Sequence, residues 1–580
     1  MKSPLRVGVL IDDGTMPALL KYLLKCQNST YNIVLVISCK SPLLDSSGRF
    51  YFIRKLQNRG FPRFARSASL YIIEKLELFF LSCLPAFRTA IDKCRIASYY
   101  YSSCELTYHQ IEVIPKLTQS KYRVVLSESD IKQIQEHNLD VVIRANSGIL
   151  CGDILSVAHH GVISYHHGDP SRFRGSYHGF WEAYNKASSI GFVIQRLTET
   201  LDAGNILYQG NIAATPFYAL NKLRITAKSF PFILLVLSHL SSKQQTSITG
   251  DSTINIFPYK YSTCPSFYDQ SRYIVSNLNF LFLKILSILF GQRREWNILT
   301  GKCSHNNILL ANGQLITNPP GTFLADPYNF FFKNNHYILV EQYDYSKKRA
   351  HISLMHCSNG EINNSITPLI VEPFHISFPR LFQFAGHFYL TLESCSKPGL
   401  RIYKADEFPF SWKLYSVAQS HLYLADPIIV EENSTWYLLA NIDSACIGDH
   451  DSELFVFYAD NPLSDTWSPV PGNPQIFDSR IARNGGLFRF GDTLYRIGQE
   501  QSSTTYGAAF TLSSIDLLRH DTPYDESYVT RVGPTFMPGT TGIHTLTLAD
   551  NQYVADVLIT KNIYIETAKS LFRRLKKHVI

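Results

Sequence analysis

The residues best suited to chemistry are a histidine and an aspartate in the first half of the chain. His166 follows an apolar run at 162–163 and precedes a turn, and Asp202 lies in a later loop that ends at Gly204. An imidazole at a strand end can polarise a carbonyl group, and a carboxylate within reach can keep the imidazole cationic or collect a proton. By themselves, two such residues 36 positions apart more often have a structural role.

Other common catalytic patterns are absent from the sequence. No G-x-G-x-x-G follows the first apolar run, and no G-x-x-x-x-G-K-[S/T] occurs, so neither a dinucleotide site nor a phosphate-binding loop is expected. His159, His160 and His167 lie near His166, but these histidines lack the cysteine or carboxylate partners of a usual metal site. We therefore expect no metal.

Composition indicates a globular protein of several domains. The chain has 580 residues, of which 45% are hydrophobic and 18% charged, which excludes a disordered or coiled-coil protein. The net charge of +8 is spread along the chain except for the last ten residues, so no nucleic-acid partner is expected. Eleven cysteines without a C-x-x-C pair favour reduced thiols and a cytoplasmic location.

Residues 1–245 alternate short β-branched runs with helical patterns, as an open α/β sheet does. Ser127 precedes an acidic first turn and is a predicted helix cap. The segments predict strands at 7–11, 32–38 and 140–144, and helices at 16–25 and 127–137.

Residues 306–565 change to short aromatic strands separated by Gly, Asn, Asp and Pro, and they contain a repeat. Five copies recur about every fifty residues, each pairing a turn motif with a following aromatic strand. The motifs begin at Phe323, Ser377, Tyr423, Asn484 and Gly542. A unit of this length suits four strands, so we predict a five-bladed β-propeller, preceded by a helical linker at 246–305 and followed by a basic tail at 566–580.

Three segments of the first half resemble the folate-dependent formyltransferases, the family of glycinamide ribonucleotide, methionyl-tRNA and amino-sugar N-formyltransferases. They are the strand that ends at His166, the Phe173-Arg174-Gly175 elbow and the Leu201-Asp202-Ala203-Gly204 loop, in the family's order. The resemblance covers about residues 5–215 and implies a Rossmann-like open sheet of the formyltransferase type. It also implies 10-formyltetrahydrofolate as the co-substrate.

The resemblance also implies roles for individual residues. His166 and Asp202 match the family's catalytic histidine and aspartate, whereas the position of the family's asparagine is Ser164. The candidates for cofactor binding are Arg174, Gly175 and Gly148. Attack of an amine on a formyl carbon creates an oxyanion, and a serine hydroxyl reaches less far toward it than an asparagine amide. Ser164 in place of the asparagine could therefore weaken, reroute or abolish catalysis. Because the other matching segments occur in the family's order, we still expect formyl transfer to a nucleotide-linked or lipid-linked amino sugar.

The repeat places Asp326 and Asp426 at the same position of two blades, near the start of an inner strand. Paired carboxylates cleave glycosidic bonds in glycoside hydrolases, and Glu341, Glu393 and Glu500 are candidates for the acid. Asp-Pro at a strand start is also a turn device. The alternatives are thus a glycan-processing hydrolase and a non-catalytic glycan-binding scaffold.

Residues 318–560 resemble the N-terminal propeller of plant glucosamine inositolphosphorylceramide transferases. The segments that carry the resemblance are Trp467, Asn473-Pro474, Asp478, Ala482–Gly486, Leu494–Arg496, Gln499 and Tyr506-Gly507. The glycosyl transfer domain of those enzymes is not found in this sequence. The resemblance therefore implies a glycan or nucleotide-sugar context.

Three apolar segments bear on membrane contact. Residues 277–290 form the most apolar stretch, but it contains Lys284 and is shorter than the ~20 residues that span a bilayer. Residues 68–83 and the apolar-basic segment 571–577 suit a peripheral contact with an anionic membrane face. A buried helix and a solvated basic tail are the alternatives.

Overall fold

The computed structural model describes residues 3–13, 16–40, 61–99, 108–118, 123–145, 148–169, 172–173, 175–200, 204–242, 263–303, 310–358 and 361–565. The chain divides into two compact units. The first contains Met1–Val275 with the short segment Ser444–Gly448, and the second contains Ser276–Asp443 with Asp449–Ile580. Each unit is described by itself.

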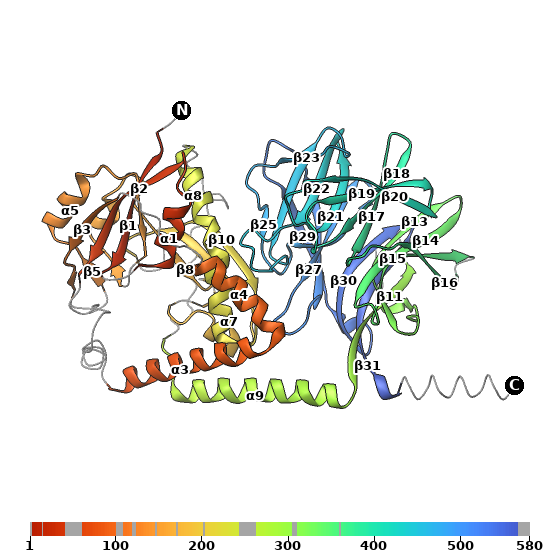
Figure 1. The fold of residues 1–580 in the computed structure, drawn as a ribbon, viewed down its shortest axis with the longest axis horizontal. Helices are drawn as coiled ribbons and strands as arrows, with labels where there is room; N and C mark the ends of the chain where they lie inside the picture. The colour runs from red at the N-terminus through yellow and green to blue at the C-terminus, as the bar shows by residue number, and fades with distance from the viewer. Residues whose placement is uncertain are drawn as a thin grey trace. The chain divides into compact units, whose positions relative to one another are not determined.

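The first unit is built on a seven-stranded sheet in the order β10-β9-β8-β6-β1-β2-β3 (Figure 1). Its strands are β1 (Leu5–Asp12), β2 (Tyr31–Cys39), β3 (His109–Val113), β6 (Val141–Arg144), β8 (Val162–His167), β9 (Ser189–Arg196) and β10 (Asn205–Ala213). The first five run parallel to their neighbours, while β9 and β10 form an antiparallel edge. The predicted open α/β sheet is therefore confirmed.

Chain order reverses beside β1, because β2 and β3 extend the sheet to one side and β6 and β8 to the other. In open α/β sheets ligands bind outside the carboxyl ends of the strands next to such a reversal. The carboxyl ends of β6 and β8, which carry Arg144 and His166, lie at this edge. The topology thus points to these two strand ends as the place for a site.

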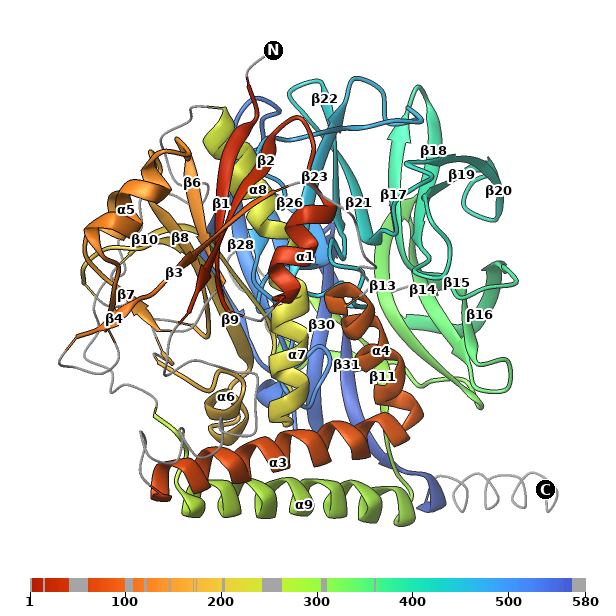
Figure 2. The ribbon, with the colours of Figure 1, turned by 60° about the vertical axis from the view of Figure 1, so that its left-hand side comes forward.

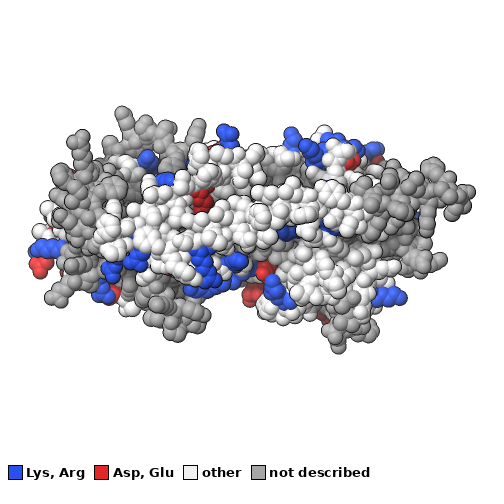
Figure 3. All heavy atoms as spheres, turned by 90° about the horizontal axis from the view of Figure 1, so that it is seen from below, with Lys and Arg blue, Asp and Glu red and all other residues white. Residues whose placement is uncertain are grey.

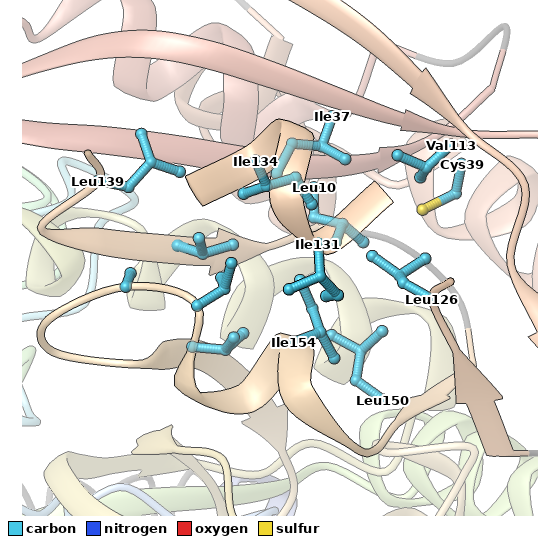
Figure 4. Close-up of a cluster of buried hydrophobic side chains, with 14 of the residues drawn as sticks. Leu10, Ile37, Cys39, Val113, Leu126, Ile131, Ile134, Leu139, Leu150 and Ile154 are labelled. Atoms are coloured by element: carbon cyan, nitrogen blue, oxygen red, sulfur yellow. The ribbon is translucent and has the colours of Figure 1, made fainter. Parts of the chain in front are cut away.

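The helix α5 (Glu128–Gln135) packs its apolar side onto this sheet. Ser127 accepts from the backbone N–H of Asp130, so the predicted cap is confirmed. Figure 4 shows Ile131 and Ile134 among side chains of the sheet such as Leu10 and Ile37. This apolar cluster fixes the strands whose ends carry the polar residues described below.

Further helices cover the first unit. They are α1 (Ala18–Lys25), α3 (Phe61–Cys83), α4 (Pro85–Tyr99), α6 (Phe180–Tyr184), α7 (Tyr218–Ser229) and α8 (Pro231–Ser241). A small sheet contains β4 (Lys116–Leu117), β5 (Arg123–Val125) and β7 (Ile149–Leu150), followed by the 3-10 turn η1 (Asp153–Ser156). The helix α9 (Phe267–Leu289) begins in this unit, and Figures 1 and 2 show its beginning beside α3.

The second unit is a five-bladed propeller, as predicted. The first blade contains β13 (Thr322–Phe332), β14 (Asn335–Asp344), β15 (Arg349–Ser358) and β16 (Glu361–Ile370), and the second contains β17 (Ser377–Phe384), β18 (His387–Glu393), β19 (Leu400–Glu407) and β20 (Ser411–Ala418). The third blade contains β21 (Ala425–Glu432), β22 (Thr435–Asn441), β23 (Glu453–Ala459), β24 (Ser468–Pro469) and β25 (Ile476–Phe477). The fourth blade contains β26 (Arg483–Phe490), β27 (Thr493–Glu500), β28 (Ala509–Leu517) and β29 (Asp525–Val532).

The fifth blade joins the two ends of the unit. It contains β12 (Gln314–Leu315), β11 (Gln292–Lys302), β31 (Gln552–Asn562) and β30 (Thr540–Ala549), with η2 (Leu310–Asn312) and η3 (Pro534–Phe536) nearby. Because β11 pairs with β31 along its whole length, the ring closes through backbone hydrogen bonds. The predicted helical linker at 246–305 therefore ends in a strand of the propeller, which a local pattern could not reveal because its partner is the last strand of the ring.

One strand of each blade lies innermost, and these strands are β13, β17, β21, β26 and β30. Each contacts the innermost strand of the next blade around the ring, so the five strands surround the axis. Each of them carries a bulge at the same point of its pairing with the neighbouring strand. The residues at the bulge are Asp326, Phe378, Asp426, Gly485 and His544. Asp326, Phe378 and Asp426 have φ of 48°, 50° and 44°, a costly conformation for non-glycine residues that concentrates at functional sites.

Candidate functional sites in the two units

In the first unit, Arg144 and Ser164 meet at the ends of two neighbouring parallel strands. The register pairs them, and Arg144 Nη1 lies 3.4 Å from Ser164 Oγ. Arg144 also donates to the carbonyl of Gly148, whose φ is 92°. The buried Ser164 hydroxyl is therefore held by a cation, and the predicted residue Gly148 is fixed beside it.

The loop that contains Asp202 ends at Gly204, close to Gln195 and Arg196 of β9. Gln195 is the register partner of Ser164, and its buried Oε1 has no hydrogen-bond partner among the described residues. A Cβ on Gly204 would lie 3.1 Å from that oxygen and 2.4 Å from the carbonyl oxygen of Arg196, so only glycine fits there. The described end of the loop thus lies beside Gln195, while Asp202 itself lies outside the described residues.

His166 lies on β8 two residues after Ser164, so both side chains point to the same face of the sheet. Its Nε2 is 3.8 Å from the place where a Cβ on Gly168 would lie, and Glu182 Oε1 is also 3.8 Å from that point. Gly168 has a φ of 113°. An imidazole and a carboxyl group therefore converge on one glycine.

Glu182 was not among the predicted site residues. It is buried on α6 and accepts a hydrogen bond of 2.7 Å from the backbone N–H of Gly179. Burial raises the pKa of Glu182 to about 7, so its carboxyl group can hold or release a proton near neutral pH. The spacing from Gly179 to Glu182, typical of a helix start, was the available sequence signal.

Two other half-buried histidines of this unit, His167 and His178, lie close to each other. His167 points to the opposite face of the sheet, where its Nε2 lies 3.0 Å from Ser229 Oγ. Burial lowers the pKa of His167 to about 4, and burial also lowers the pKa of His178, whose ring lies 5.0 Å from that of His167. Both imidazoles are therefore neutral at pH 7.

In the second unit, His544 and two aspartates form a buried charged triad on the axis. His544 Nε2 lies 3.2 Å from Asp326 Oδ1, and His544 Nδ1 lies 2.7 Å from Asp556 Oδ1. Burial alone would lower the pKa of His544, but the charge of Asp556 and the hydrogen bonds to both carboxylates raise it to about 10. The three groups also have the spacing of metal ligands.

Glu341 extends this triad. Burial, followed by the negative charge of Asp326, raises the pKa of Glu341 well above its usual value. For Asp326, burial is outweighed by the hydrogen bond and charge of His544, which lower its pKa to about 2. Glu341 is therefore a neutral acid that donates to an ionised Asp326.

A second carboxyl pair lies across the axis. Burial and the charge of Glu393 raise the pKa of Asp426, against the opposing charge of Arg483. Burial would raise the pKa of Glu393, but its hydrogen bond with Asp426 and the charge of Arg483 lower it. The two carboxyls thus share one proton, and Arg483 Nε donates to Asp426 Oδ2 over 2.6 Å.

Arg380 is the cation between the two carboxyl pairs. Its buried guanidinium stacks 3.6 Å from the centroid of the Phe378 ring, and the charges of Asp326 and Asp426 both act on it. Its Nε has no hydrogen-bond partner among the described residues. Burial lowers the pKa of Arg380 to about 10, so it remains charged with one donor available.

Tyr506 is the solvent-facing part of this axial site. Its ring is 43% exposed and lies 5.4 Å from the ring of His544, with the guanidinium of Arg483 5.2 Å from its centroid. Aromatic rings over a polar base are the usual platform for the apolar face of a sugar ring. The site can therefore present a stacking surface and several hydrogen-bonding groups together.

The structure places Glu500, a predicted candidate for the acid, away from the axial carboxyl groups. Glu500 forms an ion pair with Arg531 on the side of β27 away from the axis, with Arg531 Nη2 3.0 Å from Glu500 Oε1. Its neighbour Gln499 takes the axial place and donates to Asp426 Oδ2 over 3.1 Å. Side chains alternate along a strand, so a shift of one residue reverses the face.

Comparison with known proteins separates the chain into the same two parts. The model of the formyl transferase family matches residues 105–230. The model of the N-terminal domain of glucosamine inositolphosphorylceramide transferase 1 matches residues 301–532. The chain joins a formyltransferase-like domain to a propeller of the glucosamine inositolphosphorylceramide transferase type.

Curated relatives match about a third of this chain. Glucosamine inositolphosphorylceramide transferase 1 of Arabidopsis thaliana is 30% identical over 203 residues, which are 34% of this chain and 26% of that protein. The protein of the same name from Oryza sativa subsp. japonica is also 30% identical over 203 residues, or 27% of its length. The match thus spans about a quarter of these relatives.

Solved structures also match parts of the chain, at low sequence identity. Glycinamide ribonucleotide transformylase 1 from Symbiobacterium toebii is 14% identical with a TM-score of 0.27, over 41% of this chain and 88% of that one. Zg3597, a family 117 glycoside hydrolase from Zobellia galactanivorans, is 11% identical with a TM-score of 0.30, over 46% of this chain and 90% of that one.

Within the formyltransferase-like domain, the structure places part of the predicted site. His166, Ser164 and Gly148 lie at the ends of β6 and β8, and Gly175 has a φ of 104°. Asp202 and Arg174 lie outside the described residues, so their predicted roles stay predictions. Within the propeller, Asp326, Asp426 and Glu393 are brought together, joined by Arg380, Arg483 and His544, which the prediction missed.

Proposed function

We propose that the formyltransferase-like domain transfers a formyl group from 10-formyltetrahydrofolate to the amine of an amino sugar. The observation that supports this most is the position of His166 and Ser164 at a parallel strand end inside the segment that matches the formyl transferase family. The acceptor is a nucleotide-linked or lipid-linked amino sugar of glycoconjugate biosynthesis. The curated relatives are named glucosamine inositolphosphorylceramide transferases, a name that joins an amino sugar to a lipid.

The residues near His166 fit a ligand that offers N–H groups. The orphaned Oε1 of Gln195 is a buried acceptor, and the backbone approaches it closely at Gly204. The bound co-substrate supplies the formyl group. An N–H of an amine or a pterin is the partner that Gln195 Oε1 lacks among the described residues.

The chain's own residues then supply the proton chemistry. His166 donates to the carbonyl oxygen of the formyl group as that oxygen gains charge, and Ser164 adds a shorter-reaching hydroxyl held by Arg144. Glu182, with a pKa of about 7, accepts the proton that the amine loses when the new C–N bond forms, and it returns a proton to the folate nitrogen that leaves when the old C–N bond to the formyl carbon breaks. The predicted role of Asp202 is to keep His166 cationic.

The experiment is a formyl transfer assay on the full chain. Purified protein is incubated with 10-formyltetrahydrofolate and a panel of free, nucleotide-linked and lipid-linked amino sugars, and N-formyl product is measured by mass spectrometry. Product is expected with wild type and is lost in His166→Ala and Asp202→Asn. The exposed His159, replaced by Ala, is the matched control. No product with any acceptor contradicts the proposal.

We propose glycan binding for the propeller. Both axial aspartates are held by cations, Asp326 by His544 and Asp426 by Arg483, which favours binding over hydrolysis. Hydrolysis remains the rival, because a neutral acid beside an ionised carboxylate is the pattern of a glycosidase. Tyr506→Ala should weaken glycan binding on an array, while Tyr528→Ala, whose ring is 64% exposed on β29, should not. Release of sugar that Asp326→Asn abolishes would instead establish hydrolysis.

A further inference from the structure

The helix α3 carries an apolar stripe that faces solvent. Ile72, Leu76, Phe79 and Phe80 are between 51% and 63% exposed. They recur every three or four residues, so they lie on one side of the helix. Single exposed apolar residues are ordinary, but a contiguous stripe marks an interaction surface.

The helix α9 repeats this arrangement. Leu278, Phe282, Ile285 and Leu289 are between 56% and 64% exposed and recur at the same helical spacing. The opposite side of its first turns faces the protein: Gln270 Oε1 accepts from Ser69 Oγ over 2.7 Å. Its apolar side is therefore directed away from the protein rather than into a core.

Hydrogen bonds hold the beginning of α9 to α3. Besides the Ser69 contact, Tyr273 Oη donates to Glu77 Oε2 over 2.9 Å. Figures 1 and 2 show the beginning of α9 beside α3. Figure 3, which views the side where they lie, shows mostly uncharged atoms there with Lys and Arg side chains close by. We call the exposed apolar residues of α3 and α9 the apolar face.

The acidic and the basic residues of α3 and α9 differ in how far they are exposed to solvent. The acidic residues of the two helices are engaged: Glu74 with Lys222, Glu77 with Tyr273 and Asp269 with Ser266. Four of the five basic residues of the two helices are exposed, namely Arg63, Lys75, Arg272 and Lys284, while Arg66 is partly buried. The surface therefore presents apolar groups and positive charge together.

The segment from Ile563 onward is also rich in apolar and basic residues. Ile563, Tyr564 and Ile565 are between 42% and 62% exposed, and Tyr564 Oη donates to the carbonyl of Leu289 over 3.2 Å. In the sequence after residue 565, five basic residues stand against one acidic residue, Glu566. They are Lys569, Arg573, Arg574, Lys576 and Lys577.

Length argues that α9 lies along a membrane rather than across it. Phe267–Leu289 passes a hydropathy test for spanning with a mean hydropathy of 1.3, and 6% of that stretch is buried. Its first turns, however, are hydrogen-bonded to α3 through Gln270 and Tyr273. Residues 276–290 would extend only about 22 Å as a helix, against the ~30 Å of a hydrocarbon core. The other stretch that passes the test, Tyr218–Ser241, is 56% buried.

We propose that α3 and α9 bind, parallel to the surface, in the boundary between headgroups and acyl chains of a membrane that contains anionic lipids. Apolar side chains on one side with exposed Lys and Arg beside them are the features of an interfacial helix. The basic residues are attracted to anionic headgroups. A second copy of this chain fits less well, because two such faces would bring like charges together.

The test is flotation of the full chain with vesicles. Vesicles of phosphatidylcholine with one quarter phosphatidylglycerol should carry the protein upward, and raised salt or phosphatidylcholine alone should reduce binding at least fivefold. The double substitution Phe80→Glu with Phe282→Glu should reduce binding at least tenfold. Phe410→Glu is the matched control, because Phe410 and Phe282 are both 57% exposed.

Three results would overturn the proposal. The first is wild-type protein that stays at the bottom of the gradient with both vesicle types, and the second is a double variant that floats like wild type. The third is a lipid-free dimer, detected by light scattering, that the double variant dissociates.

Depth is measured separately with Phe282→Trp. Quenching of the added tryptophan should be stronger by a spin label near the headgroups than by one near the bilayer centre. The reverse order would show that α9 spans and would also overturn the proposal.

Discussion

His544 and Asp326 lie at the same bulge position of the two neighbouring strands β30 and β13, with Nε2 and Oδ1 3.2 Å apart. These residues are 218 positions apart in the sequence, so their ion pair forms only when the ring closes. Asp556 holds the other imidazole nitrogen at 2.7 Å. Closure of the propeller and assembly of its axial site are therefore one structural event.

Replacing His544 by Gln should destabilise the propeller by about 3–5 kcal/mol, because the buried carboxylates of Asp326 and Asp556 lose their shared cation. Denaturant unfolding followed by tryptophan fluorescence measures this, since Trp296, Trp412, Trp436 and Trp467 all lie in the second unit. The exposed His387, replaced by Gln, should leave the transition unchanged. Equal midpoints for the two variants would contradict the triad.

The stability of the propeller should fall as pH rises from about 6.5 to 10. His544 binds its proton more tightly in the folded chain, because the charge of Asp556 and the hydrogen bonds outweigh burial and raise its pKa to about 10. The stabilisation is therefore complete below the unfolded pKa of 6.5 and is lost through the folded value. Unfolding midpoints across this range should slope downward for wild type and less for His544→Gln. Parallel slopes would show that His544 is not the titrating group.

Gln499 and its neighbour Glu500 should respond differently to substitution. Gln499→Leu removes hydrogen bonds to Asp426 Oδ2 and to the carbonyl of Asn484, and it should cost about 1–3 kcal/mol of stability. Glu500→Gln weakens an ion pair with the half-exposed Arg531 and should cost about 0–1 kcal/mol. Both variants are compared by denaturant unfolding. A larger loss of stability for Glu500→Gln than for Gln499→Leu would contradict this assignment of the two residues.

The first unit should lose stability as pH rises from about 4.5 to 7. Burial raises the pKa of both Glu77 and Glu182 from 4.5 to about 7. Between these values the unfolded chain releases protons that the folded chain keeps, so unfolding becomes easier. Glu182→Gln and Glu77→Gln should each flatten the slope of helix melting, recorded by circular dichroism. An unchanged slope in the double variant would contradict the raised pKa values.

The α/β sheet and the propeller could be predicted from the sequence, because the patterns that indicate them are either local or repeated along the chain. Buried β-branched runs and the Ser127 cap predicted the parallel sheet and α5. Five turn motifs predicted five blades, since each motif marks the bulged inner strand of its blade. β11 was missed because its partner β31 lies at the far end of the ring.

The site could be predicted only in part, because its missing members are defined by contacts between distant segments. Arg380 and Arg483 reach the axial carboxyls from other blades, and nothing in their local sequence marks them as axial. Glu500 was mistaken for Gln499 because the face of a strand residue depends on a register that local composition does not fix. Glu182 was missed because its raised pKa comes from burial in the folded unit.

The central claim, formyl transfer at the end of β8, is tested most directly by the rate of N-formyl product formation from 10-formyltetrahydrofolate and an amino sugar. The account predicts product with wild type and with His159→Ala. It predicts a rate at least about 10²-fold lower with His166→Ala, because the main donor to the developing oxyanion is removed. Equal rates for His166→Ala and wild type would contradict it.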